Sequence, residues 1–169
     1  GAVAAGILGC GSVILGASEM AGRLFVEVEE CAGAHGDIGK AATAVLKEWR
    51  AQGRAIPGYG HPLHKDRDPR VAALFAVVQK HGASLRYIAI AEAIESQIEQ
   101  VIGKPLKLNV SAAIPAVLLG VGFPLAALKG VPILARTAGL IAHLNEELEQ
   151  PIGFALSYQA ARDVKYEGE

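Results

Sequence analysis

Two histidines and two aspartates lie close together in the least regular stretch of the chain. His61 and His64 have H-x-x-H spacing, and Asp66 and Asp68 follow directly, in a segment broken by prolines. Imidazole and carboxylate groups are common metal ligands, but a proline-broken segment does not force them to converge. The same residues are also typical of a solvated polar loop or, because glycines let the backbone pass close to a ligand, of a pocket for a small anion.

Two arginines are candidates for binding a carboxylate. Arg70 lies nine residues after His61, in the predicted first turn of a helix, and the planar guanidinium fork matches a carboxylate. Arg136 is the only charged residue between Val131 and His143, on an otherwise apolar helical segment. An arginine in such a place pairs with a buried acid or points to an anionic ligand, and the sequence leaves both interpretations open.

Several short motifs, taken in order, carry a resemblance to a known family. They are Gly11–Glu19 (ending in Leu-Gly-Ala-Ser-Glu), Pro57-Gly-Tyr-Gly-His61 followed by Asp68-Pro69-Arg70, Asn109-Val110, and Ala135–His143 (A-R-T-A-G-L-I-A-H). In order and spacing they resemble the citrate synthase superfamily, and most closely its shorter bacterial members, the citryl-CoA lyases and citrate synthase-like proteins. The resemblance implies an all-α fold with a large and a small domain, and a homodimer whose active sites lie in the cleft between the domains.

The resemblance also implies roles for residues of this chain. His61 corresponds to the histidine that polarises the carbonyl of the oxo acid. Arg70 and Arg136 keep carboxylate-binding positions, and Lys65 matches a basic position that contacts a coenzyme A phosphate. The backbone of the loop Ile56–Gly60 would receive the adenine, so four residues of this loop are candidate cofactor-binding residues: Pro57, Gly58, Tyr59 and Gly60.

Other positions depart from the family pattern. The family histidine that stabilises the enol of acetyl-CoA falls on Ile14, and the catalytic aspartate falls on Ser111. A serine acts as a base only when another group deprotonates it. His35 beside Asp37 is a local alternative base, and a plain turn is the other interpretation of that segment. The family's later arginine appears as Gln150.

The resemblance implies an acyl-CoA carbon–carbon lyase or synthase. It would cleave citryl-CoA or a relative to acetyl-CoA and a 2-oxo acid such as oxaloacetate, or run the reverse. Coenzyme A enters as a thioester substrate. We expect no tightly bound cofactor and no metal, because the arginines and His61 supply positive field where alkoxide charge develops. The alternative is a non-catalytic acyl-CoA or dicarboxylate-binding protein on the same scaffold, which Ile14 and Ser111 favour.

The elements that position these residues are predicted to be helices. The 169 residues are 51% hydrophobic but only 5% aromatic. This aliphatic, alanine-rich composition excludes disorder, argues against a β-sandwich and is typical of closely packed helices. Asp68-Pro69 and Asn109 are predicted helix starts, and the tail after Pro151 is short and partly polar. Amphipathic or apolar periodicity predicts helices over these ranges: 2–25, 38–52, 70–81, 84–102, 110–119 and 132–149.

The charge pattern restricts the partners. The net charge is −1 and no long basic run occurs, so we expect no nucleic-acid binding. Gly1–Ser18 and Leu108–Leu128 are uncharged, but their glycines and prolines favour short buried helices over membrane spans. Cys10 and Cys31 lie on unrelated segments, as is typical of reduced thiols in a cytoplasmic protein.

The resemblance divides the chain into three parts. Residues 1–16 would be a remnant of the large domain, residues 17–121 the small, CoA-binding domain, and residues 122–169 the C-terminal helices of the large domain. The uncharged start has no initiator methionine, and the related proteins are longer at the N-terminus. We therefore expect this chain to be the C-terminal part of a longer protein.

Overall fold

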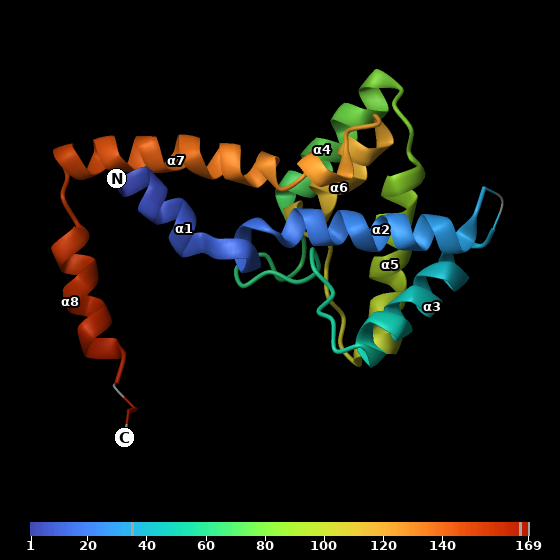
Figure 1. Ribbon diagram of the computed structural model, residues 1–169, viewed down its shortest axis with the longest axis horizontal. Coiled ribbons are helices and arrows are strands. Elements are labelled where there is room, and N and C mark those ends of the chain that lie inside the picture. Colours follow the sequence, from blue (N-terminus) through green and yellow to red (C-terminus); the bar gives the residue numbers. More distant parts are fainter. Residues whose placement is uncertain (35, 166, 169) are drawn as a thin grey trace. The chain divides into compact units, whose positions relative to one another are not determined.

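The chain is helical throughout the part that the structure describes. Figure 1 shows the computed structural model, which describes residues 1–34, 36–165 and 167–168. Its elements in chain order are α1 (Ala2–Leu15), α2 (Ala17–Ala32), α3 (Ile38–Ala51), α4 (Pro69–His81), α5 (Arg86–Ile102), α6 (Val110–Gly120), the 3-10 helix η1 (Leu125–Ala127), α7 (Gly130–Glu149) and α8 (Gly153–Asp163). Among these residues no strand forms, and one isolated β-bridge joins Tyr59 to Leu108. The all-α prediction is confirmed.

Two compact units divide the chain. Unit 1 comprises Gly1–Gly9 and Ile133–Glu169, and unit 2 comprises Cys10–Pro132. Within α1 the helical path breaks at Gly11, whose φ of 58° lies in the left-handed region that glycine tolerates best. The assignment of residues 1–16 and 122–169 to a large domain, and of 17–121 to a small one, stays a prediction.

Unit 2 has a mainly aliphatic core to which five helices, α2 to α6, contribute. α2 packs against α3 and α6, and α5 packs against the same two helices. The apolar stripe predicted for the segment 38–52 is buried on α3, and its members are Ala41, Ala42, Val45, Leu46 and Trp49. Asp37 precedes the helix, and its Oδ1 accepts a hydrogen bond of 3.1 Å from the Lys40 amide. The predicted period and the predicted start of this helix are therefore both confirmed.

The candidate site in unit 2 is built around the N-terminal ends of two helices, α4 and α6. Asp68 caps α4 with Pro69 in its first turn, and Asn109 caps α6, both as predicted. The Asn109 Oδ1 atom accepts a hydrogen bond of 2.8 Å from the Ser111 amide. α6 then continues through the buried Pro115 to Gly120, so this proline does not end the helix.

Unit 1 contains a helix that the sequence did not predict. α8 forms in the tail after Pro151, where the Glu147 carboxylate accepts hydrogen bonds from the amides of Ile152 (3.0 Å) and Gly153 (2.9 Å). The capping side chain belongs to the preceding helix α7, so the tail itself carries no start signal. Neither α7 nor α8 has a buried residue, although both present large exposed apolar side chains, among them Leu134, Ile141, Leu148, Phe154 and Leu156.

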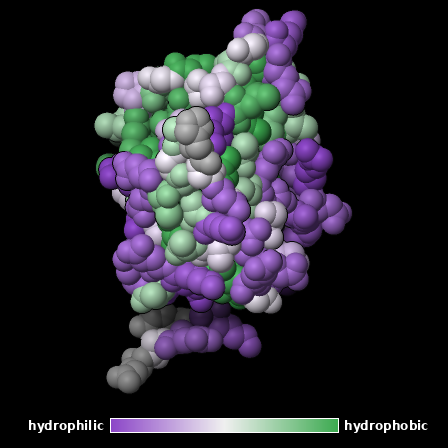
Figure 2. Space-filling view, turned by 90° about the vertical axis from the view of Figure 1, so that its right-hand side faces the viewer, coloured by the Kyte–Doolittle hydropathy of each residue, from purple (hydrophilic) through white to green (hydrophobic). Residues whose placement is uncertain are grey.

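The face drawn in Figure 2 exposes both hydrophobic and hydrophilic side chains. Hydrophilic side chains cover much of the face drawn in Figure 2, and the hydrophobic areas on it gather mainly in the upper half. Two helical stretches, Ala2–Ala32 and Leu125–Glu149, are long and apolar enough to cross a membrane by length and composition alone, a test that core helices of soluble proteins also pass.

Candidate functional site

The predicted ligand loop is fixed to the segment that leads into α6. The Asn109 amide donates to the Gly58 carbonyl (2.9 Å), the Gly60 amide donates to the Lys107 carbonyl (2.6 Å), and the Asn109 Nδ2 group donates to the Gly60 carbonyl (2.6 Å). Gly58 has a φ of 86°, and a Cβ atom there would lie 2.5 Å from the Cβ of Ala112. Only glycine fits this close approach without a shift of the loop or the helix.

Tyr59 anchors the same loop from the other side. Its ring is buried, and its hydroxyl donates a hydrogen bond of 2.9 Å to the carbonyl of Ala91 in α5. Burial raises the pKa of the phenol well above its usual value, and the nearby Glu95 carboxylate raises it further. Tyr59 therefore stays protonated, and its hydroxyl is already bonded within the chain.

His61 follows the anchored loop and has a defined tautomer. Its Nδ1 atom accepts hydrogen bonds of 3.1 Å from the backbone amides of both Leu63 and His64. An imidazole nitrogen that accepts two N–H groups carries no proton, so in the neutral ring the proton is on Nε2. The ring is partly exposed and lies 4.6 Å from the His64 ring, centroid to centroid. His61 can therefore donate one hydrogen bond from Nε2 in a fixed direction.

Asp68 connects the starts of two helices through one buried carboxylate. Its Oδ1 accepts from the Arg70 amide (3.1 Å) and Nε (2.9 Å), and its Oδ2 accepts from Arg70 Nη2 (2.8 Å) and the Val110 amide (2.9 Å). The side chain is 1% exposed. The Arg70 guanidinium, with help from the two amides, holds the pKa of this carboxyl far below its usual range despite burial. The sequence offered Asp68 as a helix cap and as a possible metal ligand but not as the partner of Arg70, although the D-x-R spacing that allows the pair was visible.

Hydrogen bonds bring several predicted site residues together within unit 2. Gly60, which precedes His61, bonds to Asn109, and the next residue, Val110, bonds to the Asp68–Arg70 pair. Ser111 follows as the second residue of α6 and is half-buried. The loop, the arginine and the position of the family aspartate are thus tied to one helix start.

The first turn of α6 is fully bonded within the chain. Asp68 accepts from the Val110 amide, the Asn109 side chain accepts from the Ser111 amide, and the Asn109 carbonyl accepts from the amides of Ala112 and Ala113 (both 3.1 Å). No amide of this turn is left over for an anionic ligand, so a ligand charge must meet side chains instead.

No side-chain hydrogen bond or ion pair among the described residues joins the remaining predicted residues to this network. Lys65 is exposed in the segment between His61 and Asp68, and Ile14 is exposed near the end of α1. Arg136 is exposed on α7 in unit 1 and forms no ion pair with any described residue. His35, weighed above as an alternative base, lies outside the described residues, and the described ones contain no group of three or more metal-ligating side chains that could hold an ion.

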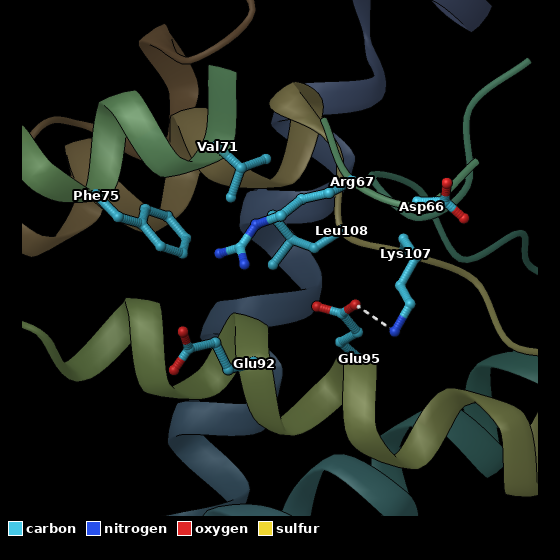
Figure 3. Close-up of a pocket in the computed structure, with 8 residues that line it drawn as sticks. All are labelled: Asp66, Arg67, Val71, Phe75, Glu92, Glu95, Lys107 and Leu108. Carbon is cyan, nitrogen blue, oxygen red and sulfur yellow. Dashed lines mark ion pairs between the residues drawn. The ribbon is translucent and has the colours of Figure 1, made fainter. Parts of the chain in front are cut away.

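A separate cavity of about 170 Å³ opens between α4, α5 and the segments before α4 and α6 (Figure 3). Arg67 extends into it, and the Glu95 carboxylate pairs with Lys107 at 3.5 Å. Val71, Phe75 and Leu108 form its apolar part, with Glu92 and Asp66 at its edge. The mixed charges favour no single ligand sign. Of the residues singled out from the sequence only Asp66 lines this cavity, and the predicted catalytic, carboxylate-binding and coenzyme A-binding residues do not.

The sequence matches a family model described as citrate synthase, C-terminal domain, over residues 1–153. Among curated proteins it is similar to a citrate synthase of Saccharolobus solfataricus, with 28% identity over 141 residues, which cover 80% of this chain and 35% of the relative. A citrate synthase-like protein of a Phoma species is 29% identical over 101 residues, which cover 56% of this chain and 22% of that protein. The chain thus spans about a third of the length of the first curated relative and less of the second.

Solved structures share the fold. Citryl-CoA lyase from Hydrogenobacter thermophilus matches with a TM-score of 0.77 and 35% identity, covering 99% of this chain and 62% of the other. An ATP citrate lyase of Methanothrix soehngenii, solved in complex with citrate and coenzyme A, matches with a TM-score of 0.72 and 23% identity, covering 96% of this chain and 27% of the other. The helices described above therefore follow a citrate synthase-like arrangement.

Proposed function

The chain belongs to the citrate synthase family, and from that premise we propose that it is the catalytic part of an acyl-CoA carbon–carbon lyase or synthase. In the cleavage direction the substrate is citryl-CoA or a related acyl-CoA, and the products are acetyl-CoA and a 2-oxo acid such as oxaloacetate. The similarity to citryl-CoA lyase at 35% identity supports this substrate class.

The bonding of His61 is the observation that carries the proposal. In the synthetic direction the enol carbon of the thioester attacks the oxo carbon, and the oxo oxygen gains negative charge. The N–H on Nε2, fixed by the two amides on Nδ1, is the donor that such an oxygen needs. In cleavage the substrate hydroxyl gives up its proton to solvent, and the same hydrogen bond stabilises the resulting alkoxide. The carbon–carbon bond then breaks to form the oxo group and the enolate of acetyl-CoA, whose carbon takes up a proton from solvent.

Other residues bind the two substrates in this proposal. Arg70 and Arg136 hold carboxylates, the backbone of Pro57–Gly60 receives the adenine, and Lys65 contacts a phosphate of coenzyme A. The glycine conformations of the loop and its bonds to Asn109 support a fixed backbone surface there. Coenzyme A enters and leaves as a thioester substrate, and the protein acts as a homodimer in the cytoplasm.

A second candidate, a non-catalytic acyl-CoA or dicarboxylate-binding protein, is favoured by two positions. Ile14 and Ser111 stand where the family has a histidine and an aspartate, and neither side chain is a base at neutral pH. In this candidate the loop, Lys65 and the arginines still bind the ligands, but the carbon–carbon bond is neither formed nor broken.

Turnover of citryl-CoA separates the two candidates. We expect His61→Ala to lower the rate about 10²–10³-fold, the usual cost of one donor to a developing oxyanion. His81→Ala is the matched control, because His81 is exposed at the end of α4. Binding of coenzyme A and citrate without any turnover by the unchanged protein would establish the second candidate. Equal rates for His61→Ala and His81→Ala would remove His61 from the mechanism.

A further inference from the structure

Asp68 controls which edge of the Arg70 guanidinium is available. A guanidinium has N–H donors on Nε, Nη1 and Nη2, arranged in a rigid plane. Asp68 takes the Nε hydrogen and one Nη2 hydrogen in a bidentate contact of 2.9 and 2.8 Å. Both Nη1 hydrogens and the second Nη2 hydrogen remain, and these make no hydrogen bond within the described residues. One Nη1 hydrogen and the free Nη2 hydrogen form the far edge of the plane, away from the chain of Arg70.

The orientation of this edge is fixed by the burial of the carboxylate that holds it. Asp68 is 1% exposed, whereas the Arg70 side chain is 50% exposed. The two carboxylate oxygens are also bound to the amides of Arg70 and Val110, so the carboxyl plane cannot rotate without breaking bonds at two helix starts. The inner edge of Arg70 is therefore anchored while the outer edge reaches solvent.

We propose that Asp68 is a positioning residue that aims the Nη1–Nη2 edge of Arg70 at one carboxylate of a di- or tricarboxylate substrate. The same carboxyl group holds the Val110 amide, so it sets the distance between this edge and the start of α6, where Ser111 lies. The inference rests on the proposed function, in which Arg70 binds a carboxylate, and it adds the orientation of that contact and the residue that imposes it.

The proposal predicts that an arginine, and not any cation, is needed at position 70. A lysine ammonium is a compact charge without a second planar edge. It could bind Asp68 or the substrate, but it could not present two parallel donors to the substrate while two others stay on Asp68. The Asp68–Arg70 pair carries no net charge, so the contact selects by geometry more than by attraction at a distance.

Separate calorimetric titrations with citrate and with coenzyme A test the proposal. In Asp68→Asn the single carbonyl oxygen replaces two acceptors, and the amide N–H₂ group faces donors. We expect the affinity for citrate to fall at least about tenfold, the scale of a lost charge-assisted hydrogen bond, and the affinity for coenzyme A to stay unchanged. Glu29→Gln is the matched control, because it breaks an ion pair of 2.7 Å with Arg86 elsewhere in unit 2.

A purely structural role for Asp68 gives a different pattern. Equal losses of citrate and coenzyme A affinity in Asp68→Asn, or no loss of citrate affinity, would overturn the inference while leaving the proposed function in place. If the unchanged protein bound neither ligand, the proposed function would fail, and the inference with it.

Arg70→Lys provides a test that does not depend on the folding of Asp68→Asn. Arg70 is half exposed, and the substitution keeps the charge. We expect citrate affinity to fall at least about tenfold with coenzyme A affinity retained. Citrate affinity equal to that of the unchanged protein would show that charge alone suffices at this position and would also overturn the inference.

Discussion

Apolar side chains are buried in unit 2, whereas those of α7 and α8 in unit 1 are largely exposed. In unit 2 the helices α2, α3 and α5 each bury a row of side chains, and Trp49 is inaccessible to solvent. In α7 and α8, by contrast, no residue is buried, and Leu148 and Phe154 are 86% and 96% exposed. Both sets of helices nevertheless carry abundant apolar residues.

The difference separates two properties that a hydrophobic pattern is often asked to predict together. Helix formation follows from local periodicity and capping, and it holds in both units. Burial requires a second surface at the right place. Among the described residues the helices of unit 2 provide such surfaces for one another, whereas α7 and α8 have no buried residue. An apolar stripe therefore predicts a helix more securely than it predicts a core.

Substitution of Trp49 in unit 2 should have the largest effect on stability, in contrast to an exposed apolar residue of unit 1. It packs in the core, donates from its ring nitrogen to Glu27 and lies under the Arg54 guanidinium, 3.5 Å from the ring centroid. We expect Trp49→Ala to lower the free energy of unfolding by about 3–5 kcal/mol, through lost burial and a cavity. Phe154→Ala, in exposed surroundings, should change it by less than about 0.5 kcal/mol.

Urea denaturation followed by far-ultraviolet circular dichroism measures both variants. This probe is needed because Trp49 is the only tryptophan, so its removal abolishes the fluorescence signal. Similar midpoints for the two variants would contradict the contrast between a packed and an exposed set of helices.

Features that depend on contacts between residues close together in the chain could be predicted from the sequence. The stripe of α3, the Asp68-Pro69 start of α4 and the Asn109 start of α6 depend on residues within a few positions of one another, and all were predicted. The glycines of the ligand loop were also singled out. The close approach of Gly58 to Ala112, however, joins residues more than fifty positions apart and appeared only in the structure.

Longer-range features escaped prediction for the same reason. The bond between Asp68 and Val110 links residues 42 positions apart, so the sequence showed a helix cap and not the connection between two helices. The tautomer of His61 depends on the path of the backbone at Leu63 and His64. Roles drawn from the resemblance for Arg136, Lys65 and Ser111 stay predictions, because they concern ligands.

Acid should destabilise unit 2 through Asp68. The pKa of this carboxyl is far below its usual value of about 3.9, chiefly because Arg70 bonds to its charged form. A lowered pKa contributes stability that is present above the pKa of the unfolded chain and is lost as the pH falls through that of the folded protein. We expect Asp68→Asn to lower the free energy of unfolding by about 1–3 kcal/mol near neutral pH, and by less as the pH falls below about 4.

Urea denaturation of both proteins between neutral and acidic pH measures this difference. The two stability curves should converge on the acid side, because the unfolded chain of the unchanged protein takes up a proton at this carboxyl there, whereas asparagine binds none. A difference that stayed constant down to the acid limit would show that the shape of the side chain, not its charge, stabilises the two helix starts.

Glu147 in unit 1 should give the smallest effect, although its bonding resembles that of Asp68. The amides of Ile152 and Gly153 lower the pKa of this carboxyl, but the group is exposed to solvent and salt, which weaken such a contact. We expect Glu147→Gln to speed hydrogen exchange at the first amides of α8 and to leave the unfolding of unit 2 unchanged. The difference in exchange between the two proteins should disappear as the carboxylate of the unchanged protein is protonated below about pH 4. Glu149→Gln, which removes a charge from the same helix without touching these amides, should leave the exchange of α8 as it is. A shift of the unit 2 midpoint by Glu147→Gln as large as that of Asp68→Asn would mean that exposed and buried carboxylates at helix starts stabilise this protein alike.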